Sequence, residues 1–139
     1  MDKKMKKKKK WSDKQDFYIS VDMFKVDIVF ICNCNEKEVK ERFKKASGDN
    51  FKHFKKGMTE GWDNIYNTGR MFSFRGGFVV LLKNEGNFRR FVANLVHEVT
   101  HVTHYLLRDR RIPLNDDTEE IYTYLVEYIT EQALIKLYD

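Results

Sequence analysis

Residues 78–110, FVVLLKNEGNFRRFVANLVHEVTHVTHYLLRDR, contain the two elements that decide the fold. Residues 78–83 form an apolar run of strand length, and Asn87 can cap a helix that follows it. From there to about Arg110, apolar residues recur at the spacing of one helix face: Phe88, Val92, Leu95, Val99, Val102 and Leu106. This pattern predicts a strand followed by a long amphipathic helix that packs on a sheet.

The same helix carries the motif H-E-x-x-H at residues 97–101, on the side opposite its apolar face. Residues four apart lie about 40° apart around a helix and about 6 Å along it, so His97 and His101 can reach one metal ion. Glu98 can then reach a water bound to that metal and act as a general base. The motif predicts a catalytic zinc site, and the alternative is a solvated polar face that happens to carry histidines.

A catalytic zinc site needs a third protein ligand. A final helix, predicted to follow Pro113 and to run to about Leu137, offers four glutamates: Glu119, Glu120, Glu127 and Glu131. We favour Glu120, because it lies near the start of the helix that the connection returns toward the metal. Glu119 lies about 100° away around the helix, on a different face. The alternative for Glu120 is an ordinary acidic face in contact with solvent.

Three further side chains are candidates for roles at the same site. His104 follows His101 on the same helix face, where it could be an alternative ligand, a partner of a ligand, an oxyanion donor or simply a polar residue. Tyr124, one turn after Glu120, could stabilise an oxyanion through its hydroxyl or merely fill an amphipathic surface. Glu127 could accept a hydrogen bond from a ligand histidine, since metal-bound imidazoles usually donate their other N–H.

The chain from residue 78 to about residue 134 resembles the gluzincin class of zinc metallopeptidases, and most of all its small phage- and prophage-encoded members. In these proteins H-E-x-x-H is followed by a short connection with Gly-Ile-Pro and by a helix with an E-x-x-A-Y-type sequence. Here the connection reads RIP at residues 111–113 and the helix reads EIYTY at residues 120–124. Arginine therefore replaces the glycine and Thr123 replaces the alanine, and neither change removes a ligand.

The resemblance implies that His97, His101 and Glu120 bind Zn²⁺ and that Glu98 is the catalytic base. It also implies that the chain hydrolyses peptide bonds of a peptide or protein substrate with a metal-activated water. In such enzymes a strand before the motif helix lies beside the extended substrate, so residues 78–83 are expected to be an edge strand. A proline at Val80 is then expected to cripple cleavage and leave the metal content intact.

The first half of the chain predicts the rest of the sheet. Residues 17–34 read as one or two strands, and residues 28–31 are apolar on both faces, as in the middle of a sheet. Residues 71–83 read as a hairpin around Gly76 and Gly77. The predicted fold is α+β: a minimal zincin-like domain with a small mixed or antiparallel sheet packed on the H-E-x-x-H helix and a C-terminal helix.

Between these strands, Asn35 can cap a short surface helix over residues 36–46. Its inward residues are expected to be Val39, Phe43 and Ala46. Cys32 and Cys34 are expected to be core thiols on one strand face, because no other cysteine is present to complete a cysteine-rich metal site.

The net charge of +5 comes from 26 Lys and Arg against 21 Asp and Glu, but it is unevenly distributed. Residues 1–10 hold seven lysines and one aspartate, so the remaining chain carries about −1. We expect residues 1–10 to be a disordered Lys-rich tail and residues 11–139 to be a single domain. The tail is either a solubilising leader or a weak contact to nucleic acid or another polyanion.

Neither a secretory signal nor a membrane-spanning run is present, and the two cysteines suit a reducing compartment. The expected location is the cytoplasm of a bacterium or of a phage-infected host, with no membrane partner. The leading function is a zinc metallopeptidase. The alternatives are a non-catalytic zinc-binding regulatory or structural module, and a nucleic-acid-associated protein that acts through its lysine tail.

Overall fold

The computed structural model describes residues 11–47, 56–74, 76–84 and 86–138, so the lysine-rich tail lies outside the described residues. Four strands and three α-helices are found in these ranges: β1 (Gln15–Val21), β2 (Val26–Cys32), α1 (Glu36–Ser47), β3 (Gly69–Phe74), β4 (Gly77–Leu82), α2 (Phe88–Asp109) and α3 (Glu119–Tyr138). Two short 3₁₀ turns, η1 (Asp22–Phe24) and η3 (Lys56–Met58), complete them. The fold is α+β, as predicted.

The strands form one mixed sheet in the order β1-β2-β4-β3. β2 pairs in parallel with β4, while β1 and β3 are antiparallel to their neighbours and lie at the two edges. The interior position expected for residues 28–31 is confirmed. The chain crosses over between the two parallel strands through α1, and the β3–β4 hairpin turns where it was predicted.

The expectation that residues 78–83 form an edge strand is wrong. β4 pairs on both sides, and its side chains from Phe78 to Leu82 are at most 3% exposed. Its run of five consecutive apolar residues has no polar face, which is the pattern of an interior strand. Gly77 at its start lies so close to the Asp27 carbonyl that a Cβ atom would collide with it. In this hairpin the strand at the sheet edge is β3.

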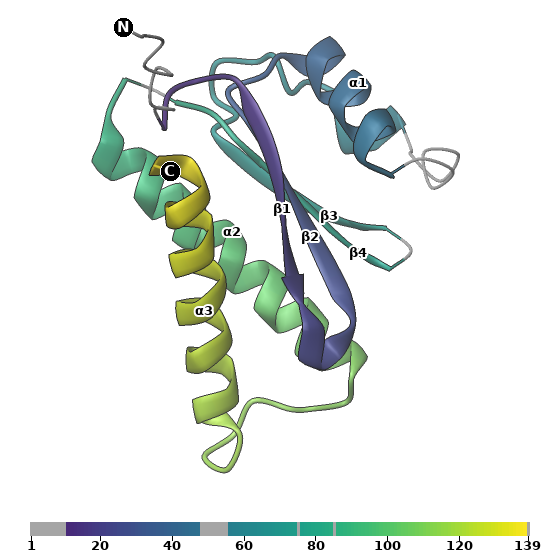
Figure 1. Ribbon diagram of the computed structural model, residues 1–139, viewed down its shortest axis with the longest axis vertical. Helices are drawn as coiled ribbons and strands as arrows, with labels where there is room; N and C mark the ends of the chain where they lie inside the picture. Colours follow the sequence, from purple (N-terminus) through teal and green to yellow (C-terminus); the bar gives the residue numbers. More distant parts are fainter. Residues whose placement is uncertain (1–10, 48–55, 75, 85, 139) are drawn as a thin grey trace, which may run out of the picture.

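Helices cover both faces of the sheet (Figure 1). α2 and α3 lie together on one face, and their apolar side chains form a continuous core with alternate residues of β2 and β4. α1 lies on the other face, where a smaller core surrounds Trp62. None of the helices within the described ranges is long and apolar enough to cross a membrane.

α2 begins at its predicted cap, since the Asn87 side chain accepts hydrogen bonds from the N–H groups of Arg89 and Arg90. Its buried face is rotated slightly from the predicted one: Phe91 is 1% exposed, whereas Phe88 is 40% exposed. Phe88 instead contacts Trp11 and Tyr138 at the edge of the core. The Phe88–Tyr138 contact joins the start of α2 to the end of α3, so the two helices run antiparallel.

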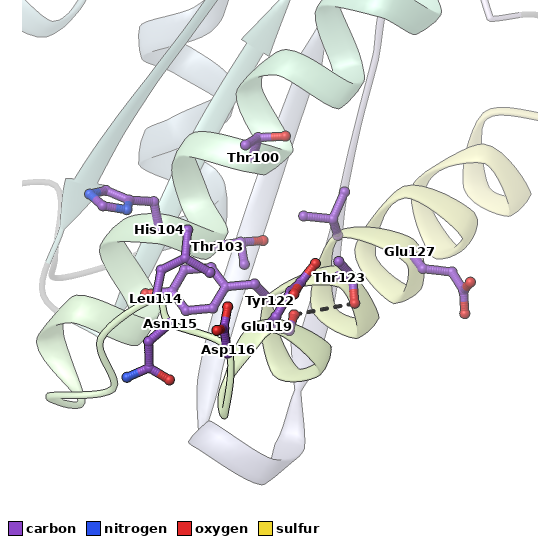
Figure 2. A pocket seen from close by; sticks show the side chains of 11 residues that line it. Thr100, Thr103, His104, Leu114, Asn115, Asp116, Glu119, Tyr122, Thr123 and Glu127 are labelled. Atoms are coloured by element: carbon purple, nitrogen blue, oxygen red, sulfur yellow. Dashed lines mark hydrogen bonds between the residues drawn. The ribbon is translucent and has the colours of Figure 1, made fainter.

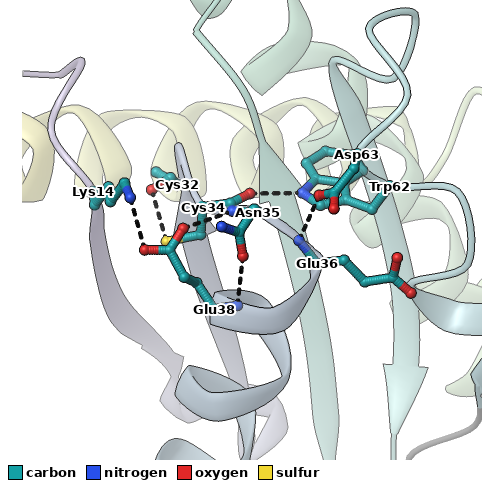
Figure 3. A network of polar contacts seen from close by, with 8 residues as sticks. All are labelled: Lys14, Cys32, Cys34, Asn35, Glu36, Glu38, Trp62 and Asp63. Atoms are coloured by element: carbon teal, nitrogen blue, oxygen red, sulfur yellow. Dashed lines mark hydrogen bonds and ion pairs between the residues drawn. The ribbon is translucent and has the colours of Figure 1, made fainter.

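A polar network fixes the start of α1 (Figure 3). The Asn35 side chain accepts a hydrogen bond from the Glu38 N–H at 2.8 Å, and the Glu38 carboxylate accepts one from the Asn35 N–H at 3.0 Å. Asp63 adds a bond from the Glu36 N–H at 2.6 Å. This reciprocal cap confirms the predicted start of the helix. Val39 and Phe43 face inward as expected, but Ala46 is exposed.

The two cysteines do not share a face, which corrects the sequence prediction. Cys32 ends β2 on the α2 side, whereas Cys34 belongs to the core on the α1 side. Asn33 between them adopts a left-handed conformation with φ of 64°, so the strand alternation is broken. Both thiols are free and buried, and burial raises the pKa of each, so both stay protonated.

Candidate metal centre

The two motif histidines converge on the exposed side of α2. Their Nε2 atoms lie 3.2 Å apart, and the side chains of both His97 and His101 are exposed. Two nitrogen ligands at 2.0–2.1 Å from one tetrahedral zinc ion would be separated by about 3.3 Å. The spacing of the pair therefore fits two ligands of a single metal ion.

Glu98 lies beside this pair but is turned inward. The residue is 6% exposed, and its Oε2 atom is 3.8 Å from His97 Nε2. Burial raises the pKa of the Glu98 carboxyl, while the nearby His97 and His101 lower it, and the net direction is upward. A desolvated carboxylate with a raised pKa has more affinity for a proton, which suits a general base.

The edge strand β3 passes close to this carboxylate. A Cβ atom added at Gly69 would lie 3.3 Å from both Cγ and Oε2 of Glu98, so the strand backbone passes close to the carboxylate. The Lys83 N–H donates to the Thr68 carbonyl, which fixes Thr68 and Lys83 as a hydrogen-bonded pair. By the alternation of an antiparallel ladder, the N–H groups of Gly69, Met71 and Ser73 face away from β4. The free edge expected for residues 78–83 thus lies on β3, next to Glu98.

The structure does not bring Glu120 to the histidine pair. Glu120 and Tyr124 line a groove with Phe24 and its neighbours in η1, on another side of α3. Within the ranges that the structure describes, no three His, Cys, Asp or Glu side chains lie close enough to hold a metal ion. Two of the predicted ligands and the predicted base are assembled, and the third ligand stays a prediction.

The alternative candidates lie together in a cavity that adjoins the motif at Thr100 but is not lined by the histidine pair. His104, Glu119 and Glu127 all line a cavity between α2 and α3 (Figure 2). Figure 2 shows the Glu127 carboxylate directed away from α2, so a contact with a ligand histidine is not formed. Glu119 and Glu120 thus occupy separate surfaces, in keeping with the 100° that separates them on the helix.

Sequence reasoning missed three residues at or near this centre. Gly69 was missed because only the pairing of β3 with β4 brings it to Glu98. Asn94 lies one turn before Glu98, and its buried Nδ2 atom has no hydrogen-bond partner among the described residues. Thr103 is 1% exposed and its hydroxyl is likewise without a partner there. The available signal was that both Asn94 and Thr103 are polar residues bordering the apolar face of the helix.

Comparisons of this chain with protein-family models, with curated proteins and with solved structures found no match. The likeness to gluzincins therefore stays a prediction.

Proposed function

We propose that this chain is a zinc-dependent metallopeptidase. One observation carries the proposal: two imidazole nitrogens converge at 3.2 Å beside a buried carboxylate that lies under an open strand edge. A metal-dependent hydrolase needs these parts together, namely ligands, a base and a place for the substrate. Zinc, when bound, supplies a Lewis acid that activates water for attack on a carbonyl.

The residues of the chain have separate roles in this proposal. His97 and His101 hold the metal, and Glu98 takes the proton from the attacking water. The resemblance to gluzincins makes Glu120 the third ligand. In that role Glu120 must leave the groove that it lines with η1 and approach His97 and His101. Tyr124, on the same side of α3, would serve as an oxyanion donor only in that arrangement.

The substrate is a peptide in extended conformation, bound along β3. The outward N–H groups of Gly69, Met71 and Ser73 offer hydrogen bonds to an added strand, and Gly69 brings that strand next to Glu98. Met71→Pro removes one outward N–H and should lower cleavage at least several-fold without loss of zinc. Met71→Ala is the matched control for the side chain. Equal activity of Met71→Pro and Met71→Ala would contradict binding along β3.

Val80→Pro no longer tests this idea. Val80 is fully buried in an interior strand, so a proline there would remove a ladder hydrogen bond to β2 and disrupt the core. We expect that variant to fail to fold, with loss of both zinc and activity.

The non-catalytic zinc module is the second candidate. A structural zinc site is closed by its ligands and has no need of a base, whereas the buried Glu98 has a cost to folding that catalysis would explain. The nucleic-acid alternative rests on residues 1–10. Deletion of these residues should leave zinc content and hydrolysis unchanged and should weaken only salt-sensitive binding to polyanions. We place the protein in the cytoplasm, which suits its two free thiols.

Metal analysis tests the assignment of the ligands. The purified protein should hold about one zinc ion per chain, and His97→Ala or His101→Ala should abolish tight binding. Comparison of Glu120→Gln with Glu119→Gln then identifies the third ligand, with Glu120→Gln expected to weaken zinc binding more. Absence of zinc from the wild-type protein, with none taken up on addition, would contradict the proposed function.

A further inference from the structure

A cavity of about 670 Å³ lies between α2 and α3, directly beyond the motif (Figure 2). Thr100 and Thr103 of α2 line it, and they stand one residue before and two residues after His101. Ligand sites commonly have volumes of roughly 300–1,000 Å³. The cavity therefore begins within the motif at Thr100, although neither His97 nor His101 lines it.

The cavity has an apolar wall that is held in place. Leu114, Tyr122 and Val126 contribute this wall. The Tyr122 hydroxyl donates a hydrogen bond to the Ile112 carbonyl at 2.9 Å, which ties the connection between the helices to α3. Leu114 is 61% exposed, so its side chain is accessible from the cavity. The wall can accept a chain of methylene groups.

The polar residues that line the cavity make it negative. Asp116, just before α3, and Glu119, in its first turn, line it, and no lysine or arginine of the described residues does. Acidic residues at the start of a helix are also favoured by the helix dipole, so they do not define a ligand site by themselves.

Thr103 supplies the independent observation. It is 1% exposed and lines the cavity, yet its hydroxyl has no hydrogen-bond partner among the described residues. Figure 2 shows this hydroxyl directed toward the space between the two helices. An unpaired buried hydroxyl is unfavourable in the free protein, and a hydrogen-bond donor that enters the cavity would satisfy it.

We propose that this cavity binds the side chain of a lysine or arginine of the substrate, close to the bond that is cleaved. The methylene stem packs on the apolar wall, and the cationic head carries several N–H donors. These donors reach the carboxylates of Asp116 and Glu119 and the hydroxyl of Thr103. The inference rests on the proposed peptidase function, and the experiments below separate the two.

The first experiment maps the cleavage sites of the zinc-loaded full-length protein in a complex peptide mixture by mass spectrometry. Lysine and arginine should be enriched about ten-fold or more at one fixed position relative to the cleaved bond, as expected for charge-assisted hydrogen bonds. Cleavage without this enrichment would overturn the basic-residue pocket and leave the peptidase intact. Absence of any cleavage would overturn the peptidase, and the pocket would then be decided by binding.

The binding experiment uses the Glu98→Gln protein, so that no turnover occurs. N-acetyl-arginine amide and N-acetyl-norleucine amide are titrated separately, and amide chemical shifts are followed by NMR. The arginine compound should shift the amides of Thr100, Thr103 and Thr123 around the cavity, and the norleucine compound should not. Equal shifts with both compounds, or none with either, would overturn the pocket.

Matched variants test which residues of the cavity bind the basic side chain. Asp116→Asn should lower the preference for a basic residue about two- to five-fold, whereas Asp117→Asn, a neighbour that does not line the cavity, should not. Thr103→Val should lower the preference for a basic residue about five-fold. Thr59→Val removes an equally buried hydroxyl on the other face of the sheet and should leave this preference unchanged. Equal effects within either pair would overturn the assignment.

Discussion

The two faces of the sheet use their buried polar groups in different ways. On the α1 face, the Trp62 indole donates to the Cys34 carbonyl at 2.9 Å, and Asp63 caps α1. On the α2 face, Asn94, Thr103 and Thr130 each have a buried polar atom with no partner among the described residues, and Glu98 is buried beside exposed histidines. Among the described residues on the α1 side, Thr59 is the comparable exception.

This difference separates residues that hold the fold from residues available for chemistry. Polar groups on the α1 face are bonded within the chain, so their loss should reduce stability. Unpaired groups on the α2 face have a cost to stability, so their replacement by apolar groups of similar shape should not reduce it. Substitutions on the two faces should therefore change different measured quantities.

The largest effect is expected on the α1 face. Trp62 is fully buried, and the Lys83 ammonium lies 4.4 Å from the centre of its ring. Trp62→Ala should lower the free energy of unfolding by about 3–5 kcal/mol in urea titrations, through the cavity and the lost indole bond. Tyr66→Ala, at a residue 86% exposed, is the control and should change it by less than about 0.5 kcal/mol. A loss below about 1 kcal/mol for Trp62→Ala would contradict this role.

A smaller effect is expected where β3 meets the candidate centre. Gly69→Ala would place a Cβ atom 3.3 Å from the Glu98 carboxylate, so the carboxylate must move by a few tenths of an ångström. We expect kcat/KM to fall about ten-fold while zinc content stays the same. Gly57→Ala has nothing within 4 Å of the added atom and is the control. Unchanged activity of Gly69→Ala would show that β3 does not position Glu98.

The smallest expected effect is an increase in stability, at Thr103. Because the Thr103 hydroxyl is buried without a partner, Thr103→Val should raise the free energy of unfolding by about 1 kcal/mol. Thr100→Val is the control, since the Thr100 hydroxyl donates to the Val96 carbonyl at 2.7 Å and its loss should bring no gain. Destabilisation by Thr103→Val in thermal unfolding would mean that this hydroxyl is satisfied in the folded protein.

Local patterns in the sequence predicted much of this structure. The cap at Asn87, the cap at Asn35, the hairpin before α2 and the H-E-x-x-H pair all depend on residues a few positions apart, and all were found. The interior place of β2 followed from its apolar character on both faces. The α+β class was also predictable, because helix and strand patterns are each local features of the sequence.

Features that depend on distant parts of the chain were not predictable in this way. The parallel pairing of β2 with β4 made β4 an interior strand and left β3 at the edge beside Glu98. Trp62 fills a core on the α1 face from a segment with no regular pattern. The relative orientation of α2 and α3 determines where the glutamates of α3 lie with respect to the histidines, and helical spacing within α3 alone does not contain that information.

The central claim is that Glu98 acts as a base at a metal held by its neighbours, and Glu98→Gln tests it most directly. Zinc content and peptide hydrolysis should be measured on the same preparation, with Glu131→Gln, an exposed glutamate of α3, as the control. The account predicts about one zinc ion per chain in both variants, with hydrolysis reduced about 10²- to 10⁴-fold only in Glu98→Gln. Hydrolysis that survives Glu98→Gln at the wild-type rate would contradict it.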